Sequence, residues 1–149
     1  MPAVVLLDTN VWVSAFLNPS GPPARVRHAW YAGRYEVVTS LPLLEELSDV
    51  LTRPRLTRKY PIVADDVTEF LQLLVERSTV VTPTGSIREC RDPDDDVLLE
   101  TAILGKAQYV VTRDDDLKHD LDLIEHLELR GVIVLSVRQF LDKLDQGEL

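Results

Sequence analysis

The feature of this sequence that most constrains its fold is a regular alternation of short apolar segments with longer helical patterns. Apolar, largely β-branched segments at 3–7, 35–39, 79–82, 109–112 and 132–135 predict five strands. The first has no polar break, which is typical of a strand that is buried on both faces in a parallel sheet. Helices are predicted at 11–17, from Pro22 onward, and at 43–51, 64–76, 97–107, 121–129 and 137–144. This alternation predicts an α/β fold, a three-layer α/β/α sandwich around a mostly parallel sheet of four to five strands.

Length and composition fit one domain over residues 1–149. A chain of 149 residues that is 45% hydrophobic can bury a core, which excludes wholesale disorder. Its single cysteine, Cys90, cannot form an internal disulfide or supply a zinc site built from cysteines. No apolar run approaches the roughly 20 residues that cross a bilayer, and the N-terminus lacks the features of a signal peptide. We therefore expect a cytoplasmic protein that does not bind membranes.

The net charge limits how this chain can bind nucleic acid. With 16 basic and 25 acidic residues, the formal charge is −9. Binding to phosphates depends on locally placed Lys and Arg, because the overall charge opposes it. The densest basic cluster lies in a predicted loop at 53–60 and comprises Arg53, Arg55, Arg58 and Lys59. These residues are candidate phosphate contacts, and a solvated loop is the alternative.

Acidic residues gather where predicted strands end. Asp8 directly follows the first strand, Asp114 comes shortly after the fourth, and nine Asp lie between positions 92 and 122. Ligands of open α/β sheets bind outside the carboxyl ends of the strands. Carboxylates brought together there repel one another unless they are protonated or bridged by cations, and such oxygen ligands suit Mg²⁺ or Mn²⁺. For Asp94, Asp95 and Asp96, capping of a helix N-terminus is the alternative role.

The helical pattern at 43–51 separates two neighbouring glutamates. At about 100° per residue, its apolar residues form one continuous arc. Glu46 lies at the edge of that arc, whereas Glu45 points to the opposite side. Glu46 is therefore predicted to face a cleft at the rim of the core, and Glu45 to be solvated.

Four segments of the chain resemble the PIN-domain family in their order and spacing. They are LLDTNVWVSA from position 6, SLPLLEELSDVLTRPRL from 40, DPDDDVLLETAILGKAQYVVTRDDDL from 92 and VIVLSVRQFL from 132. The resemblance extends over nearly the whole chain, and the closest branch is that of VapC-like toxin components of toxin–antitoxin pairs. It implies an Mg²⁺- or Mn²⁺-dependent endoribonuclease, the toxin of a type II pair, which hydrolyses RNA phosphodiesters by metal-activated water.

The resemblance also assigns roles to individual residues. It implies four catalytic acids that are also metal ligands, with one further metal ligand beside them: Asp8, Glu46, Asp96 and Asp114, and then Asp116. It implies three polar residues that orient ligands or water: Asn10, Ser40 and Thr112. Runs of consecutive Asp leave open the choice between Asp95 and Asp96, and that between Asp114 and Asp116.

Three partners are implied by the same resemblance: an RNA substrate, a small antitoxin protein and a second copy of this chain in a homodimer. The basic residues of the 53–60 loop then become candidate RNA contacts. The alternative function is a catalytically inert PIN-like module that binds protein or RNA. Such modules usually lack the acidic residues, all of which are present here.

The remaining reactive and aromatic side chains are assigned to packing or to the surface. The helical spacing of Trp12 and Trp30 favours packing in the core or between subunits over stacking on bases. The histidines are expected at the surface, without a catalytic role: His28, His119 and His126. Cys90 lacks the ordered His/Asp signature of an activated nucleophile. A haloacid-dehalogenase-type phosphatase is disfavoured because Asn10 stands where that chemistry requires an acid.

Overall fold

The core of the protein is one sheet of five parallel strands, seen in a computed structural model that describes residues 2–113 and 119–149. The strand order is β3-β2-β1-β4-β5. The strands are β1 (Val4–Leu7), β2 (Glu36–Ser40), β3 (Thr79–Val81), β4 (Tyr109–Thr112) and β5 (Ile133–Ser136). The predicted parallel sheet is confirmed, with β1 at its centre.

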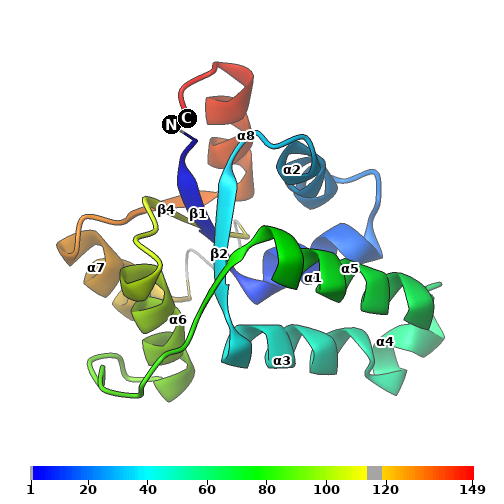
Figure 1. The fold of residues 1–149 in the computed structure, drawn as a ribbon, viewed down its shortest axis with the longest axis horizontal. Helices are drawn as coiled ribbons and strands as arrows, with labels where there is room; N and C mark the ends of the chain where they lie inside the picture. Colours follow the sequence, from blue (N-terminus) through cyan, green and yellow to red (C-terminus); the bar gives the residue numbers. More distant parts are fainter. Residues whose placement is uncertain (1, 114–118) are drawn as a thin grey trace.

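Helices cover both faces of the sheet (Figure 1). They are α1 (Thr9–Leu17), α2 (Pro22–Tyr31), α3 (Leu41–Leu51), α4 (Pro54–Lys59), α5 (Ala64–Arg77), α6 (Pro93–Leu104), α7 (Leu121–Leu129) and α8 (Val137–Asp145). One core lies under α1, α2, α3, α5 and α8, and a second lies under α6 and α7. The predicted α/β fold is therefore confirmed. None of the helices within the described ranges is both long and apolar enough to cross a membrane.

The two tryptophans belong to the larger core. Trp12 is 3% exposed and Trp30 is 2% exposed. Their ring centroids are 5.4 Å apart in an edge-to-face arrangement, and Phe70 of α5 packs 5.3 Å from Trp12. Stacking of either indole on a base is excluded by this burial, whereas the predicted core packing is confirmed.

The structure differs most from the sequence expectations at α4 and at the start of α6, while α1 and α3 each begin two residues earlier than predicted. Residues 53–60, predicted as a loop, contain α4, in which Thr57 N donates to Arg53 O at 3.1 Å and Leu56 packs against the larger core. This helix is too short to show a hydrophobic period. In addition, α6 begins at Pro93 rather than at 97, because Asp92 caps it by accepting a hydrogen bond from Asp94 N at 2.9 Å.

Close contacts with β2 fix the position of α6. The Thr101 hydroxyl is hydrogen-bonded to that of Ser40 at 2.8 Å, and both residues are fully buried. At the end of the helix, Gly105 lies directly against Val38, where an added Cβ would be 2.8 Å from the valine Cβ. Since Gly105 has an ordinary φ of −82°, close approach rather than backbone conformation requires the glycine there.

We expect Gly105→Ala to destabilise the protein by about 1–3 kcal/mol, because the new methyl group overpacks the contact between α6 and β2. Urea unfolding measures the change. Combining it with Val38→Ala removes the two valine methyl groups nearest the added Cβ. The double variant should therefore lose less stability than the sum of the single variants. An unchanged midpoint for Gly105→Ala would contradict the tight packing.

Candidate metal centre at the carboxyl ends of the strands

Asp8 is held at the end of the central strand by its neighbour β4. In the parallel register Leu7 lies opposite Val111, and Asp8 N donates to Val111 O at 2.9 Å. The next residue of β4, Thr112, donates its hydroxyl hydrogen bond to Asp8 Oδ2 at 3.2 Å. This pairing brings together two of the residues predicted for the site and orients the Asp8 carboxylate.

The three consecutive carboxylates in the first turn of α6 have different electrostatic surroundings. The charge of Asp94 raises the pKa of Glu46, several carboxylates including Asp8 raise the pKa of Asp95, and Asp96 binds the loop before the helix. Successive residues on a helix point about 100° apart, so one turn distributes adjacent side chains around its axis. The start of α6 at Pro93 therefore decides which Asp joins the strand ends.

Asp95 is the half-buried acid that interacts with Asp8. Burial raises its pKa first, and the carboxylates of Asp120, Asp92, Asp8 and Asp122 raise it further, to about 6. All of these charges are negative, so they disfavour ionised Asp95. A carboxyl group with such surroundings is a typical ligand for a divalent cation, which reverses the local electrostatics.

Asp96, the acid that the resemblance assigns to the site, binds the backbone of the loop before α6. Its Oδ1 accepts hydrogen bonds from Cys90 N at 2.7 Å and Glu89 N at 3.0 Å. The hydrogen bond from Cys90 N is the main cause that lowers the pKa of Asp96. Of the two acids that the sequence left open, Asp96 holds the loop through these hydrogen bonds, and Asp95 is the one on which the charge of Asp8 acts.

Glu46 lies across a groove from the α6 turn. The groove has a volume of about 290 Å³ and is lined by Glu46, Asp94 and Arg53, among others. Burial and the charge of Asp94 raise the pKa of Glu46, and Arg53 opposes this rise. Glu45 lines the same groove and both glutamates are exposed, so the groove does not separate them as the helical wheel predicted; the acid that acts on Glu46 is Asp94.

The other predicted site residues have different environments. Ser40 is fully buried beneath α6, so its hydroxyl joins helix to strand rather than facing solvent. Asn10 is exposed in the first turn of α1. Asp114 and Asp116 lie outside the described residues.

The predicted basic cluster lies on α4 and on the residue directly before it. Arg53, Arg55 and Lys59 line a second groove, of about 350 Å³, whose other wall comes from α1 and the end of α3. Arg58 is exposed on α4. Because Arg53 also lines the groove of Glu46, the basic residues adjoin the acidic ones.

Two acids near the site were not singled out from the sequence. Asp120, directly before α7, acts on Asp95; its place before an apolar helical pattern was the available signal. Glu100 of α6 is only 3% exposed and accepts hydrogen bonds from Thr84 N and from Gly85 N. Burial raises its pKa, but these hydrogen bonds outweigh burial and leave the pKa below its usual value. Glu100 therefore anchors a loop.

Cys90 is poorly suited to act as a nucleophile. Burial, followed by the hydrogen bond and negative charge of Asp96, raises the pKa of its thiol to about 12. A thiol with that pKa is protonated at neutral pH and is a weak nucleophile.

Comparisons with known proteins agree with this arrangement. A sequence model described as "PIN domain" matches residues 4–116 of this chain. The chain is also 27% identical over 144 residues to "Uncharacterized protein MJ1680" of Methanocaldococcus jannaschii, which covers 95% of this chain and 92% of that protein. The family match includes both β1 and β4, together with the whole of α6.

Replacement of Asp95 by Asn is expected to stabilise the metal-free protein above pH 6. Folding raises the pKa of Asp95 from 3.8 to about 6, so ionisation opposes folding as the pH rises through 6, and this penalty is absent below 3.8. After allowance for solvent screening, the gain for Asp95→Asn is about 1 kcal/mol, or about 2–4 °C in Tm. Thermal unfolding in EDTA across this pH range measures it.

The matched control is Asp96→Asn in the same turn. Its carboxylate has a lowered pKa, so the charged form supports folding and the amide should lower Tm near neutral pH. Equal effects of the two substitutions would contradict the different environments of Asp95 and Asp96.

Proposed function

Because this chain belongs to the PIN-domain family, whose members are generally nucleases, we propose that it is a metal-dependent endoribonuclease. The observation that carries the proposal is the group of carboxylates around half-buried Asp95, which includes Asp8 at the end of β1 and which raises the pKa of Asp95. The other charges that act on Asp95 are carboxylates as well. A site of this kind attracts a divalent cation and, through it, the phosphate groups of a nucleic acid.

The donor atoms of this site fit Mg²⁺ or Mn²⁺. They are hard carboxylate oxygens, with the Thr112 hydroxyl beside Asp8. We assign the metal to Asp8 and Asp95, with Glu46 and either Asp114 or Asp116 as the further acids. When bound, such an ion lowers the pKa of water and stabilises the charge of the reacting phosphate.

The side chains around the metal ligands have positioning roles in this proposal. Thr112 holds the Asp8 carboxylate in one orientation through its hydrogen bond of 3.2 Å. The buried pair Ser40 and Thr101 keeps α6, and therefore Asp95, next to the strand ends. Glu46, with its raised pKa and its place on the groove wall, orients the attacking water.

RNA is held by α4 rather than by the overall charge. The formal charge of −9 repels a polyanion, so affinity depends on the local group Arg53, Arg55, Arg58 and Lys59. Arg53 lines both grooves and so connects the basic helix to the acids. An RNA strand bound along α4 would therefore place its phosphates next to the first turn of α6.

A cleavage assay with Mn²⁺ and a structured RNA tests the acid assignment. Asp8→Asn and Asp95→Asn should each lower the cleavage rate by more than about 100-fold, the upper end of losses from outer-shell partners of a metal. Asp96→Asn, which alters a loop contact, should retain more activity than either. Thermal shift with Mn²⁺ gives a substrate-free measure, with a rise of about 5–10 °C in the wild type that Asp8→Asn loses.

The outcomes separate two assignments and two functions. If Asp96→Asn is inactive and Asp95→Asn is active, the metal ligand in the first turn of α6 is Asp96 rather than Asp95. Wild-type protein that binds Mn²⁺ but cleaves no RNA under any tested sequence would favour the inert interaction module.

The role of α4 has its own salt-dependent measurement. Arg58→Ala and Lys59→Ala in an Asp8→Asn background should weaken RNA binding about equally for different sequences and reduce the salt slope by about one per lost phosphate contact. Arg138→Ala, an exposed arginine on α8, is the matched control. An unchanged slope in both α4 variants would contradict phosphate contacts by α4.

A toxin role, with a small antitoxin protein and a homodimer, is the finer form of the proposal, and a cytoplasmic location goes with it. Its support is the resemblance of the motifs to the VapC-like branch. Induced expression in bacteria distinguishes this role, since the wild type should arrest growth and Asp8→Asn should not. Normal growth with an active enzyme would leave the nuclease proposal standing and reject the toxin.

A further inference from the structure

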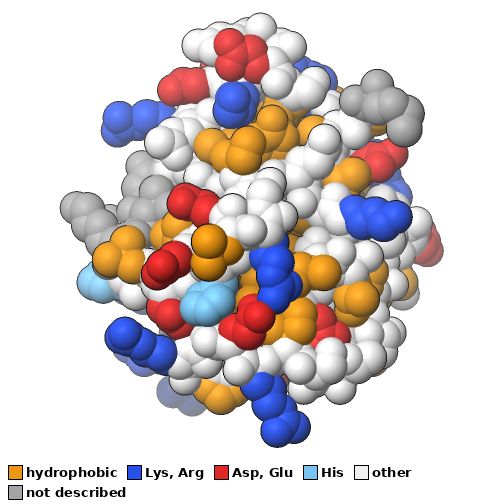
Figure 2. Space-filling view, turned by 90° about the vertical axis from the view of Figure 1, so that its left-hand side faces the viewer, with side chains coloured by type: hydrophobic (Ala, Val, Ile, Leu, Met, Phe, Trp, Pro, Cys, Tyr) orange, Lys and Arg blue, Asp and Glu red, His pale blue; other side chains and the backbone are white. Residues whose placement is uncertain are grey.

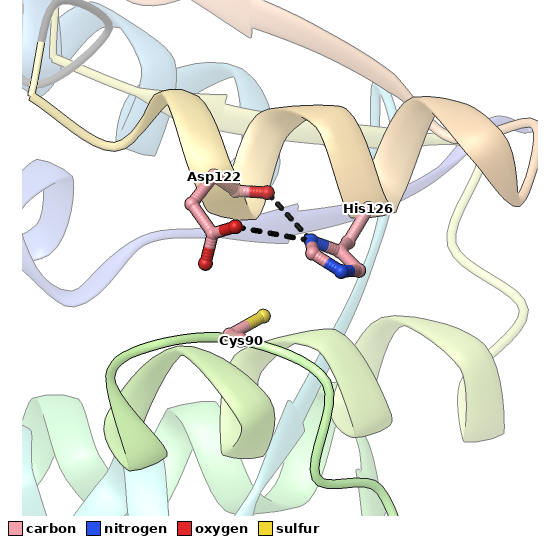
Figure 3. Close-up of side chains that lie close together, drawn as sticks. All are labelled: Cys90, Asp122 and His126. Carbon is pink, nitrogen blue, oxygen red and sulfur yellow. Dashed lines mark hydrogen bonds and ion pairs between the residues drawn. The ribbon is translucent and has the colours of Figure 1, made fainter.

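A second group of metal-ligating side chains lies on the other side of α6 from Glu46. Figure 2 shows the face that carries α6 and α7, where acidic side chains lie around a histidine. Sγ of Cys90, a carboxylate oxygen of Asp122 and a ring nitrogen of His126 all lie within 4.8 Å of one another. Asp122 and His126 project from α7 toward the thiol, which lies on the loop before α6 (Figure 3).

We propose that Cys90, Asp122 and His126 bind one Zn²⁺ ion at a site distinct from that of Asp8 and Asp95. A thiolate, an imidazole and a carboxylate are the ligand types that Zn²⁺ selects, whereas Mg²⁺ prefers oxygen ligands alone. Three protein ligands leave the fourth tetrahedral position to water. The separation within 4.8 Å exceeds the roughly 3.5 Å between ligands of a tetrahedral zinc ion, a difference that side-chain rotation closes.

The surrounding hydrogen bonds already orient two of the ligands. His126 Nδ1 lies 2.7 Å from the carbonyl oxygen of Asp122, which can only accept, so Nδ1 carries the proton. When the ring is neutral its lone pair is on Nε2, and a metal-binding histidine usually donates its other ring N–H to a carbonyl or carboxylate in this way. The Asp122 carboxylate is held in turn by Arg91 N, which donates to Oδ2 at 2.9 Å.

The loop that carries Cys90 is tied to α7 before any ion binds. Arg130, directly after α7, donates to both carboxylate oxygens of Glu89, at 2.6 and 2.8 Å. On the other side, Asp96 accepts from Glu89 N and Cys90 N. Because both backbones are held in place, binding requires the ordering of side chains alone, which limits its entropic cost.

Zinc binding releases protons from its ligands. Cys90 binds through Sγ as a thiolate and His126 binds as a neutral ring, so the thiol proton and any second proton on the imidazole pass to solvent. The hydrogen bond to the carbonyl oxygen of Asp122 and the nearby acidic charges raise the pKa of His126. Affinity should therefore rise with pH. The ion also joins the loop to α7 by direct bonds. One of its ligands, Asp122, is among the charges that raise the pKa of Asp95.

Cobalt is the spectroscopic probe for this site, used on the full chain with excess Mg²⁺ present. We expect Co²⁺ to bind in one equivalent with a near-ultraviolet thiolate-to-cobalt band, and Zn²⁺ to displace it. Cys90→Ser should abolish the band. His126→Gln, which keeps the thiol, should weaken Zn²⁺ binding measured by calorimetry by at least about 10–100-fold. Circular dichroism checks that each variant is folded.

Two matched controls separate this site from the rest of the molecule. His28→Gln changes an exposed histidine on α2, and Asp8→Asn changes the strand-end acid; both should bind Zn²⁺ as the wild type does. The absence of a thiolate-to-cobalt band in the wild type would overturn the proposal. So would equal Zn²⁺ affinity in folded wild type, Cys90→Ser and His126→Gln. Neither result depends on nuclease activity.

Discussion

The parallel pairing of β1 with β4 is the constraint on which the rest of this structure depends. It sets Leu7 opposite Val111, so that both strands end at the same level. Three of the helices then begin almost directly at strand ends: α1 at Thr9, α3 at Leu41 and α8 at Val137. Their N-termini therefore lie at the edge of the sheet where the strands end, and Asp8 lies at the same edge.

The first turn of α6 divides three chemically identical side chains among three tasks. Asp94 and Glu46 line one groove, the charge of Asp8 is among those that act on Asp95, and Asp96 holds the backbone of the Cys90 loop. Of these three acids, only Asp95 has a raised pKa, of about 6. The charge that destabilises the metal-free fold is therefore the one best suited to bind a cation, which is a common relation between stability and function.

Features that depend on neighbouring residues in the sequence could be predicted, whereas features that depend on tertiary contacts could not. The strands and long helices follow from local hydrophobic patterns, whereas the helical wheel did not foresee that Glu45 and Glu46 line the same groove. Helix α4 has one packed apolar residue, Leu56, and so no period to detect. The choice between Asp95 and Asp96 depends on where α6 begins, which the cap at Asp92 decides. The grouping of Cys90 with His126 needs the packing of α7 against the loop, and no local pattern encodes it.

The capped start of α6 also determines where the chain tolerates insertions and deletions. Asp92 and Pro93 form the capped start of α6. Residues inserted before them therefore do not change the directions of the next three side chains. A single residue gained or lost inside the turn rotates everything after it by about 100°. It would take Thr101 away from Ser40 and Gly105 away from Val38 in the same event. Among descendants of this chain, length variation should therefore collect in the preceding loop and stop abruptly at Asp92.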